Sequence, residues 1–422
     1  MKDDGVYGYN EERFLDMYKW ANIQYNDTLK YSTGFTQLLL ESPISVGKDL
    51  YNREFLLHKT IQEFQDICLS ILKDAIKTND TELLKWLLNE VISSYSLEYH
   101  KNLKDVFYTK PVFFRTDEMS LEKIAEIQCP GSLWGELELL YNFHKSRNFV
   151  LPKFSPAEIF ATQLKDFLNG EDPVIQYLTD NASAPPGVHY FIQQTRPFVK
   201  YWGIDKGVRA MNCNFIRSHS FYGLCGENYF KTRLQQENPR FKFDLPPHIL
   251  FDQKATLVLP FWKKTRHLFS DKIRNMIVYS TPLIDEQIEL EEGEMISISN
   301  FSKLPQSRRN YYLKYAGSDV SINWGSKAVY RLSNYGSGKC LELLQSCLSD
   351  FQYGKIWLLQ KELTESAEIS YYDRTETRCL DKFNAKYSSF FGPAGLIGIV
   401  ASYRKHFKVH GQEETVVGIM VP

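Results

Sequence analysis

The stretch FFRTDEMSLEKIAEIQCPG, residues 113 to 131, contains two short segments in which polar side chains recur at every second residue. Arg115 and Asp117 share one side of the first segment, and Glu126 and Gln128 share one side of the second, because side chains alternate across an extended chain. A Cys-Pro-Gly turn follows and lets the backbone bend sharply beside the acids. The pattern predicts two β-strands that each present polar groups on one face.

This polar face has two interpretations. A sheet face that meets water alternates apolar and polar residues without any chemical purpose, and this is the common meaning of charged residues in strands. However, two carboxylates and an amide oxygen that converge from paired strands are also the hard oxygen ligands that Mg²⁺ requires, and a neighbouring arginine can hold a phosphate. A metal and phosphate site is therefore a hypothesis that stands beside a solvated face.

The composition of the whole chain is that of a globular protein. Its 422 residues suggest two or three packed units, and 43% hydrophobic and 14% aromatic residues are enough to form their cores. Lysine and arginine number 50 against 51 acidic residues, so no large basic field covers the whole surface to attract nucleic acid or anionic lipid, and only local basic patches stay open. We expect neither nucleic acid nor a membrane as a partner, and the oligomeric state stays open.

Targeting signals and cysteine motifs are missing from the sequence. The opening MKDDGVYG has no apolar stretch behind a basic start, and no uncharged run is long enough to cross a bilayer. The seven cysteines are scattered without a CxxC pair, which favours reduced thiols over disulfides or a zinc site. These features predict a cytoplasmic protein.

The hydrophobic periodicity predicts an α/β (α+β) chain in several units. Residues 10–105 carry mainly helical spacing, and residues 155–170 open with Ser-Pro and close on Gly, which predicts a capped helix. A strand over 173–181, a helix interrupted near Pro197 and a strand over 210–218 follow a βαβ order. The predicted units are a helical N-terminal region (1–106), the strand pair (107–147), a βαβ substrate-side domain (148–245) and a C-terminal lobe (246–422) with strands over 311–317, 327–333 and 355–363.

Several common catalytic motifs are absent. The segment NYGSGKC, residues 334 to 340, suggests a phosphate-binding loop, but Ser333 stands where that motif has its first glycine and Cys340 replaces the metal-binding Ser or Thr. A turn into a helix is the better interpretation. The sequence also contains no G-x-S-x-G, H-E-x-x-H or G-x-G-x-x-G motif, so serine-hydrolase, zincin and simple dinucleotide functions lack support.

The R-x-D and E-x-Q segments, followed by YYLKYAGSDVSINWGSKAVYRLS and KIWLLQKEL, resemble a known family in their order along the chain. The chain resembles the circularly permuted ATP-grasp ligases of the glutathionylspermidine synthase type, in their synthetase part. The resemblance covers residues from about 107 to the C-terminus. It implies a permuted ATP-grasp fold, with a pre-ATP-grasp-like βαβ unit, a core strand pair within 107–147 and a nucleotide-binding lobe within 246–422.

The resemblance also implies roles for individual residues. It gives Asp117, Glu126 and Gln128 as magnesium ligands, and Arg115 and Arg404 as catalytic arginines. The implied ATP-binding residues are Lys254, Lys314, Gly317, Gly325, Gln360, Lys361 and Glu362. Lysines on strands offer compact positive charge to phosphates, and glycines let backbone N–H groups approach them.

The implied function is an ATP- and Mg²⁺-dependent ligase that joins a carboxylate to an amine through an acylphosphate, with small molecules or peptides as substrates. Two departures from the family pattern leave an alternative open: Gln128 stands where Asn is expected, and the phosphate loop is bulky. The alternative is a catalytically inactive protein that binds a nucleotide or another small molecule with the same fold. A third interpretation is an unrelated scaffold whose acids face water.

Overall fold

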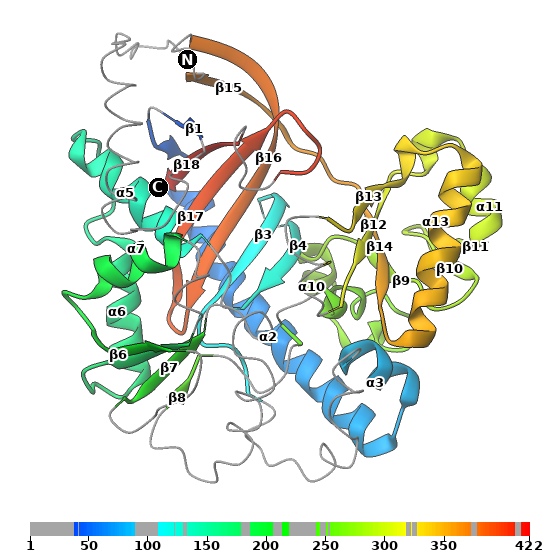
Figure 1. The fold of residues 1–422 in the computed structure, drawn as a ribbon, viewed down its shortest axis with the longest axis horizontal. Helices are drawn as coiled ribbons and strands as arrows, with labels where there is room; N and C mark the ends of the chain where they lie inside the picture. Colours follow the sequence, from blue (N-terminus) through cyan, green and yellow to red (C-terminus); the bar gives the residue numbers. More distant parts are fainter. Residues whose placement is uncertain are drawn as a thin grey trace.

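The structure of the protein is a computed structural model. It describes residues 38–40, 42–88, 109–121, 123–129, 133–178, 186–205, 213–218, 242–244, 250–251, 254–317, 322, 327–372, 378–409 and 415–422. Within these residues the chain forms a large mixed sheet flanked by helices, a smaller parallel sheet, and a small lobe with its own antiparallel sheet (Figure 1).

The large sheet combines the predicted strand pair with the C-terminal strands. Its order is β1-β18-β17-β16-β3-β4, with β15 on β16 and β2 on β18. The strands are β1 (Leu38–Leu39), β2 (Ile44–Ser45), β3 (Phe114–Ser120), β4 (Lys123–Gln128), β15 (Ser366–Tyr372), β16 (Arg378–Gly392), β17 (Gly395–Arg404) and β18 (Val416–Val421). The hairpin β3–β4 confirms the strand pair expected from the alternating pattern.

Helices cover both faces of this sheet. The long helix α2 (Lys48–Thr78) packs against the face that carries Phe114 and Phe391. On the other face, Phe113 and Phe390 pack against three helices in one core. These are α5 (Trp134–Ser146), α6 (Pro156–Phe167) and α7 (Pro186–Thr195). α6 begins after the N-cap Ser155 with a capping box, as its Ser-Pro start predicts.

The smaller sheet is parallel, in the order β6-β5-β7-β8. It consists of β5 (Val174–Leu178), β6 (Lys200–Asp205), β7 (Phe215–Ser218) and β8 (Lys242–Phe243). The helix expected here, with an interruption near Pro197, ends at Thr195, and the residues after the proline form strand β6 from Lys200 instead of more helix. The chain leaves the helix through a turn in which the N–H groups of Phe198 and Val199 donate to Thr195 O, and Tyr201 and its neighbours then pair with β5.

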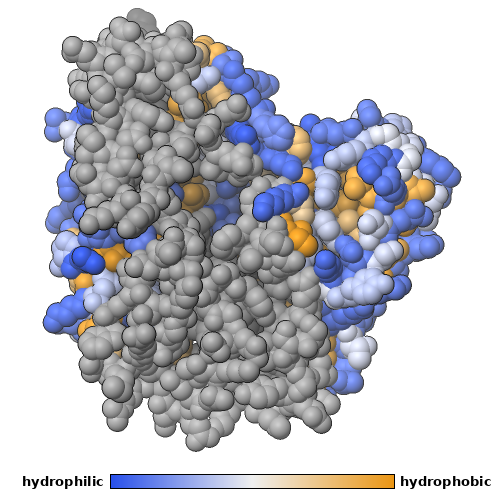
Figure 2. Space-filling model, viewed as in Figure 1, coloured by the Kyte–Doolittle hydropathy of each residue, from blue (hydrophilic) through white to orange (hydrophobic). Residues whose placement is uncertain are grey.

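The small lobe projects from the rest of the molecule, with a notch between them on the face in Figure 2. Its sheet has the order β13-β12-β14-β9. The strands are β9 (Ser280–Pro282), β12 (Tyr311–Tyr315), β13 (Val329–Arg331) and β14 (Trp357–Lys361). The lobe also holds the hairpin of β10 (Gln287–Glu289) and β11 (Met295–Ser297), and the helices α11 (Ile298–Lys303) and α13 (Ser337–Asp350). The predicted strands and helix of this region are confirmed.

Two predicted units are divided between sheets. The N-terminal region contains α2 and α3 (Thr81–Leu88) as expected, but β1 and β2 are strands where helix is expected. They pair in parallel with β18, so the backbone groups of this segment are satisfied by the C-terminus. Residues 246–422 do not form one lobe: their first part builds the small lobe, and β15 to β18 join the large sheet beside β3.

Transmembrane segments are not found in the part of the chain that the structure describes. None of its helices combines the length and the apolar character that crossing a bilayer requires.

Candidate functional site

Strand pairing places the predicted acids opposite each other. In the β3–β4 hairpin, Asp117 pairs with Glu126 and Arg115 pairs with Gln128. On the other side of β3, Ser388 of β16 pairs with Asp117. Residues directly opposite each other in neighbouring strands share a face, so all five side chains lie on the same side of the sheet.

Asp117 is surrounded by hydrogen-bond donors although it is only 5% exposed. Arg115 contacts it twice, through Nε at 2.8 Å from Oδ1 and Nη2 at 3.0 Å from Oδ2. Lys386 Nζ lies 3.0 Å from Oδ2, and the Ser388 hydroxyl donates to Oδ1 at 2.9 Å. Burial by itself raises the pKa of Asp117, but the positive charges of Arg115 and Lys386 outweigh it and hold that pKa well below its usual range. The carboxylate is therefore ionised and firmly positioned.

Glu126 has a different set of partners. Lys254 Nζ lies 3.1 Å from Glu126 Oε1, and Gln128 Nε2 donates to the same oxygen at 3.1 Å. Lys254 directly precedes the 3₁₀ helix η3 (Ala255–Val258), whose residues belong to the core beneath the strand pair. A lysine far away in the sequence is thus brought to the acid of the hairpin.

Lys314 reaches the same group of charges from the small lobe. It projects from β12, and its Nζ donates to Gln360 Oε1 at 2.5 Å. The pKa of Lys314 is lowered to about 8, mainly by burial. The carboxylates of Glu126 and Asp117 raise this pKa, and the positive charges of Lys254 and Lys386 lower it. The hydrogen bonds of Gln360 to Lys314 and to Ala125 O of β4 join Lys314 to the hairpin. We call the resulting group of side chains the cleft cluster: Arg115, Asp117, Glu126, Gln128, Lys254, Lys314, Gln360, Lys386 and Ser388.

Gln360 links the two lobes. This residue is 1% exposed, and its Nε2 donates to Ala125 O of β4 at 3.2 Å and to Ser280 Oγ of β9 at 3.1 Å. Its side-chain oxygen accepts from Lys314. Since Ala125 precedes Glu126, this amide helps to fix the small lobe relative to the acid pair, together with the backbone hydrogen bond from Val278 N to Ile124 O.

The charge of the cleft cluster favours an anion. Its four cationic side chains, Arg115, Lys254, Lys314 and Lys386, outnumber the two carboxylates. The donor set of two carboxylates and one amide oxygen suits Mg²⁺, but the carboxylates already face cations at 2.8 to 3.1 Å. The residues therefore fit a divalent cation that arrives with a polyphosphate, which would draw the cations away from the carboxylates. They fit a bare cation poorly.

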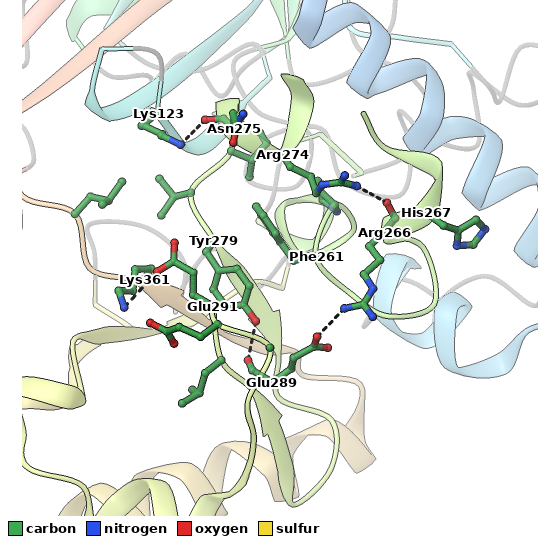
Figure 3. Close-up of a pocket in the computed structure, with 17 residues that line it drawn as sticks. Lys123, Phe261, Arg266, His267, Arg274, Asn275, Tyr279, Glu289, Glu291 and Lys361 are labelled. Atoms are coloured by element: carbon green, nitrogen blue, oxygen red, sulfur yellow. Dashed lines mark hydrogen bonds and ion pairs between the residues drawn. The ribbon is translucent and has the colours of Figure 1, made fainter. Parts of the chain in front are cut away.

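Two predicted ATP-binding residues have other contacts in the structure. Lys361 points away from the cleft cluster and pairs with Glu291 at 3.3 Å, in a separate cavity of about 870 Å³ lined also by Lys123, Phe261 and Tyr279 (Figure 3). Glu362 forms an ion pair with Arg331. The backbone N–H groups of residues 361 and 362 donate to Tyr279 O and Asn310 O. These two N–H groups are already engaged, so an adenine would have to bind to other groups of the segment. The adenine-binding role of residues 360–362 stays a prediction.

The remaining predicted residues lie at the edge of the cleft cluster or outside the described residues. Arg404 ends β17, where it pairs with Asn384, and its Nη1 donates to Lys408 O at 3.1 Å. It shares the face of Lys386, two residue pairs further along the strands. At Gly317 a side chain would collide with Tyr315 Oη. Gly325 lies outside the described residues.

Three features of the site were not predicted from the sequence. Lys386 and Ser388 come from NAKYSSFF, where they alternate with Ala385 and Tyr387 like any half-polar strand. Only the pairing of β16 with β3 assigns them to Asp117. At the other end, Phe407 stacks on Tyr312, with ring centroids 6.0 Å apart and planes 17° apart. Tyr312 shares its face of the small sheet with Lys314, two residues on, so the stack lies on the same side of that sheet as Lys314.

Comparisons with known proteins give the fold alone. Searches find no matching family model and no matching curated protein. A glutathione synthetase-like effector (GSS30) from Globodera pallida, solved in its apo form, superposes with a TM-score of 0.53 at 12% identity, over 97% of this chain and 96% of that one. The fold is similar to that of this synthetase-like protein. A "Putative gamma-glutamylcysteine synthetase" from Methylobacillus flagellatus KT matches 79% of this chain and 83% of its own, with a TM-score of 0.40 at 8% identity.

The similarity agrees with the mixed α/β fold expected from the sequence. It covers nearly the whole of both chains. The circular permutation and the narrower likeness to glutathionylspermidine synthases stay predictions, as do the roles of the single residues.

Proposed function

We propose that this protein is an ATP- and Mg²⁺-dependent carboxylate–amine ligase that acts on a small molecule or a peptide. The observation that supports the proposal is the cleft cluster: acids from one hairpin meet lysines from both lobes in a positively charged site between them. A fold similar to that of a synthetase-like protein agrees with it. A glutathionylspermidine synthase-like chemistry and a cytoplasmic location belong to the same proposal.

In this proposal the cations of both lobes bind and orient the phosphates. Lys314 and Lys254 approach from the small lobe and from the segment before η3, and Lys386 and Arg115 approach from the large sheet. Charges fixed before the reaction stabilise negative charge that develops during it, without the cost of reorienting water. The pKa of Lys314 near 8 leaves it partly neutral in the free protein, and an incoming polyphosphate would restore its proton.

The two carboxylates have the complementary task. Asp117 and Glu126 would hold the magnesium ion that accompanies the nucleotide, with Gln128 as a third oxygen donor. When bound, the nucleotide supplies the phosphoryl group that activates the substrate carboxylate. The bidentate contact of Arg115 keeps Asp117 oriented, and Lys386 can exchange Asp117 for a phosphate because its flexible side chain makes a single contact with that carboxylate.

Trapping of the activated carboxylate tests this function. The protein is mixed with ATP, Mg²⁺, pooled carboxylic acids and hydroxylamine, which opens an acylphosphate to a hydroxamate. We expect ADP and hydroxamate in equal amounts, and neither from the Asp117→Asn variant. Production of neither compound with any pool, although ATP binds, would contradict ligase activity.

A catalytically inactive nucleotide-binding protein is the second candidate. The contacts of Asp117 favour it, because both of its oxygens are already engaged by donors and at least one contact must break before metal binds. This candidate predicts ATP binding that is independent of Mg²⁺. A ligase predicts ATP binding at least about tenfold tighter with Mg²⁺ than without it, so calorimetry in both conditions distinguishes the two.

A further inference from the structure

The first turn of α13 offers a second set of groups that can bind an anion, separate from the cleft cluster: its backbone N–H groups. α13 begins at Ser337 after the N-cap Gly336, which offers no side-chain hydrogen bond. The N–H groups of a first turn lack partners within the helix and carry the positive end of its dipole. A Cβ at Gly336 or Gly338 would meet nothing within 4 Å, so the space around this turn is open.

A buried arginine lies beneath the same turn. Arg309 is 2% exposed, and its Nη2 donates to the carbonyl of Tyr335, directly before the N-cap, at 2.7 Å. Its Nε and Nη1 are buried without a hydrogen-bond partner in the described part of the chain. Cys340, in the first turn of α13, also interacts with the guanidinium. The charge of Arg309 is thus directed at the start of the helix.

Nothing described around this arginine neutralises it. No carboxylate of the described residues pairs with Arg309, while the nearby Glu342 pairs with Lys339 at 2.8 Å and Glu294 pairs with Arg308 at 3.4 Å. Burial raises the pKa of the Cys340 thiol in spite of the arginine, so this group is uncharged at neutral pH. A buried guanidinium next to the positive end of a helix is unfavourable unless an anion balances both.

We propose that the start of α13 binds a phosphate-type oxyanion, held by the N–H groups of residues 337–339 and the Ser337 hydroxyl above the charge of Arg309. Backbone N–H groups at a helix start suit the tetrahedral oxygens of phosphate, and a guanidinium adds a charge-assisted donor. The ligand is either free inorganic phosphate or the phosphate group of an organic ester, because both present the same oxygens.

The site lies on the outer side of the small sheet. Cys340 and Leu344 of α13 pack against Leu313 and Tyr315 of β12, whereas Lys314 between them projects to the cleft. Residues adjacent in a strand point to opposite faces, so the sheet separates the two anion sites. The proposal therefore stands independently of the ligase function.

Thermal unfolding of the full chain in inorganic phosphate tests the site, with sodium chloride keeping the ionic strength constant. We expect a saturable rise in Tm for the wild-type protein. Arg309→Met should weaken phosphate binding about ten- to hundredfold, the loss expected for a charge-assisted contact. Lys382→Met removes an exposed lysine outside both anion sites and should leave the phosphate response unchanged. Glycerol 2-phosphate is titrated separately, and tighter binding of this ester would identify an organic ligand.

A second variant does not depend on how Arg309→Met folds. Gly338→Asp places a carboxylate in the open space of the first turn, so it should raise Tm without phosphate and remove most of the phosphate response. Gln345→Asp, on the exposed face of the later helix, is its matched control and should do neither. A phosphate response that survives in Arg309→Met and Gly338→Asp, or that chloride reproduces, would overturn the proposal.

Discussion

Lys386 Nζ lies 3.0 Å from Asp117 Oδ2 across two neighbouring strands, although the two residues are 269 positions apart in the sequence. Both side chains are largely buried, with 8% and 5% of the two residues exposed. In the proposed ligase, a phosphate would replace Asp117 as the partner of Lys386, and a metal ion would replace Lys386 beside Asp117. Neither buried charge would then be left without a partner, which would be costly.

Replacing Lys386 tests whether this lysine binds ATP or only stabilises the fold. Lys386→Met keeps most of the side-chain volume, and Asp117 retains Arg115 and Ser388, so stability should change little. ATP affinity should fall about ten- to hundredfold, the value of one charge-assisted contact. Calorimetry measures the ATP affinity, and Lys382→Met, exposed on the same strand, is the control. Equal ATP affinities in all three proteins would show that Lys386 only neutralises Asp117.

Asp117 should govern stability in acid. Its folded pKa lies below that of the unfolded chain, so its contribution is present above about pH 4 and is lost as the pH falls through the folded value. Asp117→Asn removes this dependence and leaves Arg115 and Lys386 without this carboxylate. We expect this variant to be less stable at pH 7 and to show a flatter loss of stability below about pH 4. Urea unfolding across this acidic range and up to neutral pH checks it; parallel curves for both proteins would refute the assignment.

Lys314 should take up a proton when a nucleotide binds. Its pKa of about 8 lies below that of the unfolded chain, so between those values the folded state holds fewer protons and its stability falls as the pH is lowered through them. At a pH slightly above 8 Lys314 is partly neutral, and phosphates placed beside it favour the charged form. Calorimetry in buffers of different ionisation enthalpy should reveal this uptake in the wild-type protein. Lys314→Arg keeps the charge and should abolish the uptake without abolishing binding; unchanged uptake would exclude Lys314 as its source.

Lys314→Met distinguishes a phosphate contact from a general role in the site. The substitution preserves the packing of the side-chain stem and deletes the charge. ATP affinity should fall about ten- to hundredfold, while adenosine affinity stays within about twofold. Titration of both ligands by calorimetry separates the two roles: equal losses would mean that the broken Lys314–Gln360 bond has disturbed the whole cleft.

Phe407 should compete with the nucleoside for the ring of Tyr312. Tyr312 pairs with Gln360 of the predicted adenine-binding segment, so a base bound to that segment would meet the ring that Phe407 covers. A stacked aromatic pair contributes about 0.5 to 1.5 kcal/mol, so its removal in Phe407→Ala should raise adenosine affinity about two- to tenfold. Phe198→Ala, at an exposed position beside the smaller sheet, is the control. Weaker adenosine binding in Phe407→Ala would mean that this ring stacks on the base itself instead of blocking it.

The sequence by itself determined the local parts of this protein. Alternation over 114–128 predicted a strand pair whose acids lie on one face, and the Ser-Pro start at 155 predicted α6 with its cap. These features depend on side-chain periodicity and on contacts between residues three or four apart, which the order of residues records directly.

Only the tertiary structure decided how these parts meet. From the sequence, Asp117 and Glu126 are two acids side by side, which should repel each other. The fold places Arg115 and Lys386 around the first and Lys254 beside the second, and brings Lys314 from another lobe. Strand pairing between β3 and β16 follows from the packing of both faces of the sheet against α2 and α5–α7, over hundreds of residues of separation. No local pattern specifies such pairings, because many strands share the same alternation.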